Sequence, residues 1–255
     1  MAQARMTNTP FLAATRLARA ACLLLLAGLG GAPVFAHGVW VAQRASELAL
    51  VLGEGALDES YEPRQVREVK AFTAAGAPAQ VVLQPRQRNL VVEPAADAAV
   101  LSMAVEDGFW SQGADGKWVS GSRAQVPDAR KAGHYMKYGT TLLKPVAMPF
   151  KPLGAALEIV PLADPMALRR GQRLPIRVLS NGQPVAGAAV IGDFIGNVAA
   201  PRVKTDRAGR ATVVLGSDGL NVLAVSLVKP RADRREADED GLEATLAFAL
   251  PRKGD

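Results

Sequence analysis

Cysteine is almost absent from this chain of 255 residues, which contains only Cys22. Cys22 lies in an N-terminal segment that we expect to be removed, so the remaining chain cannot form a disulfide. It must be stabilised by its core or by a ligand. Histidine is nearly as scarce, with two residues. A serine triad would need His134 as its base, and no serine in a strained, glycine-flanked turn is available to partner it.

The sequence motifs of several enzyme classes are missing as well. It contains no zinc-protease helix motif, phosphate-binding glycine loop or nucleophile elbow. A pair of carboxylates acting as a hydrolase site stays open, because spacing along the chain says nothing about spacing in the fold. No feature favours such a pair, and we expect a protein that is not an enzyme.

A long apolar run is also lacking. The longest, Ala20–Leu29, follows three arginines and precedes the small-residue pattern Val34-Phe35-Ala36. This arrangement predicts a secretory signal peptide over residues 1–36, too short for a membrane span and cleaved before His37. We therefore expect a periplasmic protein of 219 residues, with no membrane span in the mature chain.

Strong charge of one sign is absent from the mature chain. The precursor carries a formal net charge of +6, and loss of the three signal-peptide arginines reduces it to +3. So small an excess of positive charge gives no indication of a nucleic-acid partner.

What is present is a succession of short β-rich segments separated by Gly, Pro, Asn and Asp. Their spacing predicts an all-β fold of two antiparallel, immunoglobulin-like β-sandwich domains. The proline cluster Pro145–Pro152 is the best linker, giving an N-terminal domain over 37–149 and a C-terminal immunoglobulin-like or transthyretin-like domain over 150–255. The expected strands cover 39–43, 47–53, 65–74, 79–84, 88–93, 98–105, 134–143, 156–161, 173–179, 183–194, 202–204, 211–215, 220–228 and 243–250.

Two details of the last expected strands bear on the surface. Leu246, Phe248 and Leu250 alternate with small or polar residues, which is typical of a strand buried on one face. Between this strand and the one before it lies Pro230–Gly241, composed mostly of charged residues of both signs. We interpret that segment as a solvated loop rather than a binding element.

Cleavage after Ala36 would make His37 the first residue. Its α-amine and Nδ1 could then close one chelate ring around a metal ion, and a second imidazole would complete a three-nitrogen site. His134 is the only candidate for that imidazole. Glu54, with Asp58 and Glu59 in the same loop, could add carboxylate ligands. The alternative is that His37 follows the cleavage site by chance and that His134 only forms a hydrogen bond within its strand.

An N-terminal histidine also raises the possibility of a copper-dependent oxygenase. Tyr135 or Tyr138 could supply an axial group for the copper. Aromatic residues make up only 5% of the chain, however, and no flat aromatic-rich face for a polysaccharide is evident. A third possibility is a sandwich protein that binds another protein or a surface polymer without a metal.

Several segments, in order along the chain, resemble a family of bacterial periplasmic proteins. Members are described, mostly from genome context, as accessory components of nickel or cobalt uptake transporters, and their main domain has no assigned function. The segments are AHGVWVAQRASELALVLGEGALDESYEP, EDGFWSQGADGKWVSGSR, KAGHYMKYGTTLL, LEIVPLADPMALRRGQRLPIRVLSNGQPVAGAAV, VKTDRAGRATVVL and EADEDGLEATLAFAL.

This resemblance implies two β-sandwich domains in the periplasm and a role close to transition-metal import. It implies that His37 and the loop around Glu54 face the metal, with nickel, cobalt or copper as the cofactor and a membrane transporter as the partner. A histidine is common in the family where Glu54 stands, so a carboxylate replaces a softer ligand here. That change disfavours nickel in particular. The role of His134 rests on its chemistry alone.

Overall fold

The computed structural model describes residues 37–87 and 89–250. The predicted signal peptide, residues 1–36, lies outside the described residues, as do residues 251–255. The described residues contain no helix long and apolar enough to cross a membrane.

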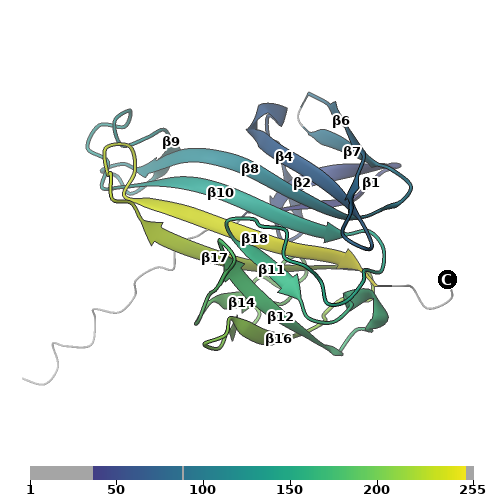
Figure 1. Cartoon of the computed structure of the whole chain (residues 1–255). Coiled ribbons are helices and arrows are strands. Elements are labelled where there is room, and N and C mark those ends of the chain that lie inside the picture. Colours follow the sequence, from purple (N-terminus) through teal and green to yellow (C-terminus); the bar gives the residue numbers. More distant parts are fainter. Residues whose placement is uncertain (1–36, 88, 251–255) are drawn as a thin grey trace, which may run out of the picture. The chain divides into compact units, whose positions relative to one another are not determined.

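The strands form three sheets (Figure 1). The first contains β1 (Gly38–Arg44), β2 (Glu47–Glu54), β3 (Leu57–Glu59), β6 (Val81–Pro85) and β7 (Leu90–Pro94). The second contains β4 (Val66–Thr73), β5 (Pro78–Ala79), β8 (Ala98–Gln112), β9 (Trp118–Ser120), β10 (Lys131–Leu142), β14 (Ala189–Ile191), β15 (Val203–Lys204), β17 (Leu220–Pro230) and β18 (Glu239–Ala249). The third contains β11 (Glu158–Pro161), β12 (Arg173–Ser180), β13 (Gln183–Pro184) and β16 (Arg210–Val214). Two short 3₁₀ turns cover Pro63–Gln65 and Pro165–Ala167.

The predicted all-β fold is confirmed, and almost every strand pair is antiparallel. One pair departs from that pattern, because β10 and β18 run parallel over ten residue pairs. These two strands are far apart in sequence, so no local turn could have predicted their pairing.

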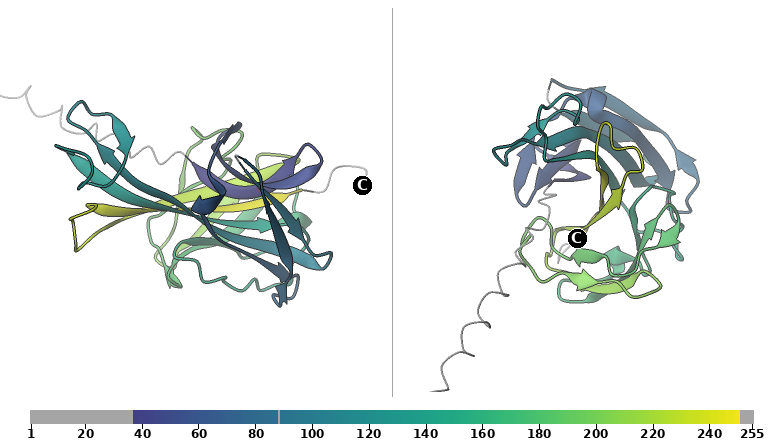
Figure 2. Two further views of the ribbon diagram at one scale, coloured as in Figure 1. Left: turned by 90° about the horizontal axis from the view of Figure 1, so that it is seen from above. Right: turned by 90° about the vertical axis from the view of Figure 1, so that its left-hand side faces the viewer.

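The second sheet is the central layer, with a different core on each face. Along β8, Leu101 packs with the first sheet, while its neighbour Val100 packs with the third sheet. This alternation follows from the period of two in a β-strand. Figure 2 shows the purple and blue strands of the first sheet and the green strands of the third on either side of β18.

The predicted domain boundary near Pro149 falls between β10 and β11. A single sheet extends across this point, because β10 from the first part of the chain pairs with β18 from the second. The division into two domains stays a prediction, and the two predicted parts share their central strands.

Strand β1 lies against β10 and β18. The Val41 amide donates a hydrogen bond to Thr141 Oγ1, and Thr245 Oγ1 donates one to the Val39 carbonyl. A Cβ atom placed on Gly139 would lie only 2.4 Å from the Val39 oxygen. Only glycine at position 139 therefore lets β1 approach β10 this closely.

The last strand is buried on both faces, unlike the half-buried strand that its alternation predicts. Leu246 and Phe248 enter the core with the third sheet, whereas Ala247 packs with Trp40 and Phe194. The smaller residues of β18 are covered by β1, and this coverage is not visible in the pattern of β18 alone.

Candidate functional site

Three adjacent strands, β8, β10 and β18, bring together polar residues from three of the segments that resemble the periplasmic family. Glu106-Asp107-Gly108 lies on β8, His134 and Lys137 on β10, and the start of β18 follows the charged segment. Strand β8 has a bulge here: Tyr135 pairs with Gly108 and Met136 with Glu106, which leaves Asp107 as the extra residue. Gly108 adopts a φ of 87°, which glycine tolerates best.

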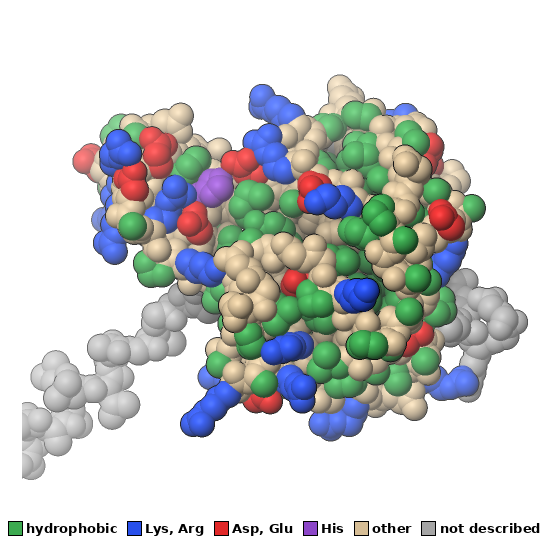
Figure 3. Space-filling view, in the orientation of Figure 1, with side chains coloured by type: hydrophobic (Ala, Val, Ile, Leu, Met, Phe, Trp, Pro, Cys, Tyr) green, Lys and Arg blue, Asp and Glu red, His purple; other side chains and the backbone are tan. Residues whose placement is uncertain are grey.

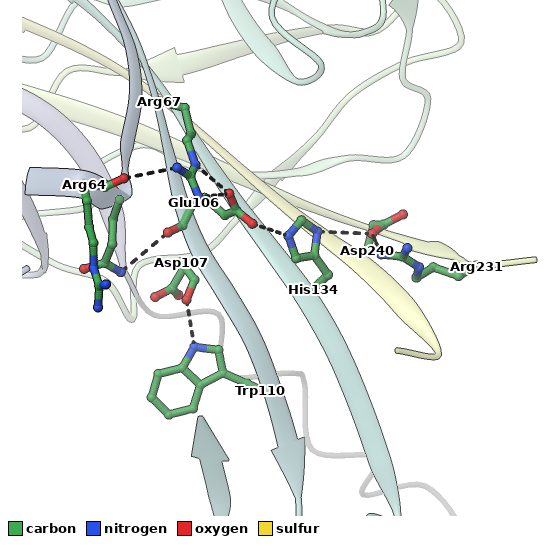
Figure 4. Close-up of polar contacts among 9 residues, drawn as sticks. Arg64, Arg67, Glu106, Asp107, Trp110, His134, Arg231 and Asp240 are labelled. Carbon is green, nitrogen blue, oxygen red and sulfur yellow. Dashed lines mark hydrogen bonds and ion pairs between the residues drawn. The ribbon is translucent and has the colours of Figure 1, made fainter. Parts of the chain in front are cut away.

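On one face of the sheet, five side chains from neighbouring strands form a line of alternating charge, here called the charge line (Figure 4). Arg67 Nη2 lies 2.6 Å from Glu106 Oε2, and Glu106 Oε1 lies 3.0 Å from His134 Nε2. On the other side, His134 Nδ1 lies 3.6 Å from Asp240 Oδ1, which also contacts Arg231 at 2.8 Å. Acidic and basic side chains also surround the histidine visible in Figure 3.

Both ring nitrogens of His134 therefore face carboxylates. Hydrogen bonds from His134 and Arg67 hold the pKa of Glu106 below its ordinary value. The ring of Phe109 lies 4.6 Å from the imidazole, between ring centres. His134 is thus fixed within the charge line, which accounts for its position without a metal.

The opposite face of the same strands holds two buried charged residues, Lys137 and Glu243, and the partly buried Asp107, here together called the buried charge cluster. Lys137 Nζ lies 3.3 Å from Asp107 Oδ2 and 3.6 Å from Glu243 Oε2. The side chains of Lys137 and Glu243 are each only 5% exposed. Two carboxylates thus share one cation in a region from which water is largely excluded.

Glu243 has the most perturbed environment of the cluster. Its pKa is raised to about 8, chiefly by burial and also by the carboxylates of Asp107 and Glu54, while Lys137 opposes the change. Oε2 of Glu243 accepts no hydrogen bond within the described part of the chain. That oxygen faces the Lys137 ammonium at 3.6 Å, so the buried carboxyl group has a cation beside it.

His37 begins the described chain beside β1. Its Nε2 lies 2.8 Å from Glu59 Oε1 on β3, and the histidine side chain is 35% exposed. Glu59 also lines a shallow surface cleft together with Tyr61. The pair is accessible to solvent, and it orients the imidazole through Nε2.

The other predicted ligands of this loop have different surroundings. Gly53 is paired with Gly38, so the next step of the register places Glu54 opposite His37. Asp58 is held by Arg44 through two contacts of 2.5 and 2.8 Å. Glu59 therefore contacts His37, Glu54 lies one residue beyond the last paired residues of β1 and β2, and the charge of Asp58 is already neutralised.

The structure does not bring the two histidines together. Residues of β10 at odd positions, such as Gly139 and Thr141, face β1, so His134 points away from the side on which β1 and His37 lie. Each histidine forms its own ion pairs. Over residues 37–87 and 89–250, no three His, Cys, Asp or Glu side chains are grouped so that they could hold a metal ion.

Sequence reasoning missed most of the charged residues found here. Glu106, Asp107, Lys137 and Glu243 were assigned no role, and Asp240 was placed in a solvated loop, whereas β18 already begins at Glu239. A signal was available in Lys137 and Glu243, since each is charged and stands within an otherwise weakly polar strand. Their partnership depends on the parallel pairing of β10 with β18, which the sequence does not reveal.

Comparison with known proteins gives a family without an assigned activity. The model of a family described as "Domain of unknown function (DUF4198)" matches residues 34–229. A protein of Haemophilus influenzae, named only as an uncharacterized protein, is 29% identical over 167 residues, covering 65% of this chain and 71% of the relative. No solved structure matches the chain.

Proposed function

The chain belongs to the DUF4198 family, and from this premise we propose that it is a non-catalytic periplasmic protein that binds a transition-metal ion at its processed N-terminus. Nickel, cobalt and copper are the candidate ions, and delivery to a membrane transporter is the role that the family resemblance suggests. The observation that carries the proposal is the contact between His37 and Glu59.

This contact involves Nε2 of His37, the ring nitrogen that does not bind the metal when the α-amine and Nδ1 form a chelate. Metal-bound histidines usually donate their second ring N–H to a carboxylate or carbonyl, which fixes the ring and its tautomer. Glu59 holds Nε2 of His37 in this way, so Nδ1 is the nitrogen left to a metal. In a chain that begins at His37, the α-amine is on the same residue and completes the chelate ring.

The surrounding charge also favours a cation. Glu54 stands opposite His37 in the strand register, and Glu59 is in contact with it. Side chains alone do not provide three grouped ligands in the described residues. The proposed site therefore needs the α-amine, and its affinity should depend on cleavage directly before His37.

Calorimetric titration with Ni(II), Co(II) and Cu(II) tests this proposal on protein that begins at His37. We expect tight binding of at least one ion by this protein. We also expect binding to be lost in His37→Ala and in protein carrying one additional glycine before His37, because the glycine moves the amine out of chelating position.

The specific role of Glu59 can be separated from the general effect of negative charge near the site. Glu59→Gln should weaken binding about 10- to 100-fold, the usual cost of losing a carboxylate that orients a metal-bound histidine. Glu62→Gln is the matched control, because Glu62 lies nearby in sequence but pairs with Arg64. Equal affinity in the processed and glycine-extended proteins would contradict the proposal and favour an interaction module that uses no metal.

A further inference from the structure

The positive charge of the mature chain is concentrated in one part of it. Residues 151–229 contain ten basic and five acidic residues, whereas the rest of the mature chain contains more acidic residues than basic ones. The positive excess therefore belongs to the part of the chain that contains the whole third sheet. Lys and Arg side chains predominate on this part of the surface, in the lower half of Figure 3.

The strand register places three arginines on the outer face of the third sheet. Residues 174, 176 and 178 of β12 enter the core, so Arg173 and Arg177 point outward. On β16, Arg210 pairs directly with Arg177 and shares its face. Arg177 Nε donates a hydrogen bond to the Ala208 carbonyl at 3.0 Å, which holds the turn that carries Arg207 beside this face. These four arginines, 173, 177, 207 and 210, are here called the basic face.

The basic face lacks counter-charges of its own. None of its four guanidinium groups forms an ion pair with any residue that the structure describes. The acidic residues that flank β16 have other partners, because Asp206 accepts hydrogen bonds from the amides of residues 208 and 210, and Asp218 contacts Arg170. Like charges directly opposite each other destabilise a sheet. The pair of Arg177 with Arg210 thus has an electrostatic cost that a bound anion would remove.

Exposed apolar side chains lie among these arginines. Val214 is paired with Arg173 and is 53% exposed. Leu162, whose amide donates a hydrogen bond to the Pro175 carbonyl, is 39% exposed. Neither β12 nor β16 contains an acidic residue. The outer face of the third sheet therefore presents apolar groups bordered by guanidinium groups.

This combination fits the surface of a bilayer that contains anionic phospholipid. The planar guanidinium group matches the geometry of phosphate oxygens, and a bilayer presents many phosphates in one plane. Exposed apolar side chains next to basic ones can enter the interfacial layer of such a membrane. An extended acidic peptide would instead use a groove or a free strand edge, and β12, which carries two of the arginines, is paired on both sides.

We propose that the basic face binds the periplasmic surface of a membrane containing anionic phospholipid. Its arginines contact lipid phosphates, and Val214 and Leu162 enter the interfacial layer. The contact is peripheral and reversible, because each basic residue near an anionic surface strengthens binding only about fivefold. It needs neither a metal ion nor the N-terminal amine, so it is independent of the proposed metal site. Such binding would hold the protein at the membrane in which a transporter lies.

Cosedimentation with lipid vesicles in EDTA tests this proposal on protein that begins at His37. Vesicles of phosphatidylcholine are compared with vesicles in which about one third of the lipid is phosphatidylglycerol. We expect binding only to the anionic vesicles, and its loss at 1 M NaCl, where the screening length is about 3 Å. The triple variant Arg173→Gln, Arg177→Gln, Arg210→Gln should lower the partition coefficient roughly 100-fold.

A second triple variant controls for the change in net charge. Arg64→Gln, Lys70→Gln and Arg86→Gln remove the same charge from positions at which each side chain already contacts a carboxylate. None of the substituted residues in either variant is buried, so both proteins should fold. The control variant should bind anionic vesicles within about threefold of the unchanged protein, because its positions lie outside the basic face.

A fluorescent label shows which surface meets the lipid. The mature chain contains no cysteine, so Val214→Cys can carry a single polarity-sensitive dye. Val82→Cys on β6 is the matched control, because Val82 is 57% exposed and Val214 53%. We expect anionic vesicles to shift the emission of the dye to shorter wavelength at position 214 and to leave it unchanged at position 82. This readout does not depend on the triple variants.

Several results would overturn the proposal. Binding that survives the substitution of the three arginines, or that falls equally in both triple variants, would place the contact elsewhere. An equal dye response at positions 82 and 214 would do the same. Binding to soluble polyglutamate without binding to anionic vesicles would assign the face to an acidic protein. Displacement from vesicles by inorganic phosphate at constant ionic strength would identify the free ion as the ligand.

Discussion

The two faces of β8, β10 and β18 carry similar charged groups in opposite circumstances. On one face, His134 lies in the charge line, where each carboxylate contacts two basic groups and the side chains are partly exposed. On the other face, Lys137 alone serves Asp107 and Glu243 in the buried charge cluster. The first face holds its charges in partly exposed pairs, whereas the second holds a carboxyl group whose pKa burial raises to about 8.

This difference shows that burial, more than the number of charges, decides how strongly a charged group is perturbed. Solvent screens an imperfect pairing on an exposed surface, and such pairs contribute little to stability. A buried carboxylate without a partner is costly. The face with the buried charge cluster is therefore the more informative one, although the other face contains His134.

Removal of the cation from each face should give the largest contrast. Lys137→Met leaves the buried Glu243 and the partly buried Asp107 without their cation, and we expect it to reduce the free energy of unfolding by about 3 kcal/mol. Arg67→Met, the matched change in the charge line, should cost less than about 1 kcal/mol. Urea unfolding of both variants measures the contrast, and equal losses would show that burial does not distinguish the two faces.

The pH dependence of stability should report the buried carboxyl group of Glu243. The pKa of Glu243 is about 8 in the folded chain, well above its ordinary value near 4.5. Between these values the folded state binds a proton that the unfolded state has lost, so stability falls as pH rises from about 4.5 through 8.

Glu243→Gln should flatten this decline, although Lys137, Asp107 and Glu54 remain. Unfolding curves at several pH values measure the difference between the two proteins. A decline of equal size in both would assign the pH dependence to other groups.

Replacement of His134 should have a small effect. His134→Gln removes the imidazole from the charge line but keeps a polar side chain, and we expect a loss of less than about 1 kcal/mol in unfolding free energy. Metal affinity should be unchanged, because His134 points away from His37. Loss of metal binding in His134→Gln would restore the paired-histidine site that the sequence suggested.

Salt should produce the smallest effect. At 1 M NaCl the screening length is about 3 Å, so the exposed ion pairs of the charge line lose most of their attraction. The difference in stability between Arg67→Met and the unchanged protein should therefore shrink at high salt. The difference for Lys137→Met should persist, because the cluster is buried. The same urea unfolding at two salt concentrations checks both expectations.

Much of the fold followed from local patterns. The strand over 134–143 and the strand over 243–250 were predicted close to their observed bounds, because apolar alternation and turn residues are local signals. The extension of β8 beyond residue 105 was missed, because the strand continues through a bulge at Asp107-Gly108, which local alternation does not reveal.

The candidate site was predicted only in part. The role suggested for His37 depended on its position after a cleavage pattern, which the sequence contains. Its partner Glu59 was named among the possible ligands, and the contact is present. The Lys137–Glu243 pair could not be predicted, because it requires the parallel pairing of β10 with β18 across more than 100 residues.

The central claim is that His37 alone, through its freed amine and one ring nitrogen, provides the nitrogen ligands of the cation site. Electron paramagnetic resonance of Cu(II) bound to protein that begins at His37 tests it most directly, because nitrogen hyperfine splitting reports the donors. We expect one amine and one imidazole nitrogen, with a spectrum unchanged in His134→Ala and abolished in His37→Ala. A spectrum that survives in His37→Ala, or that loses an imidazole nitrogen in His134→Ala, would contradict the account.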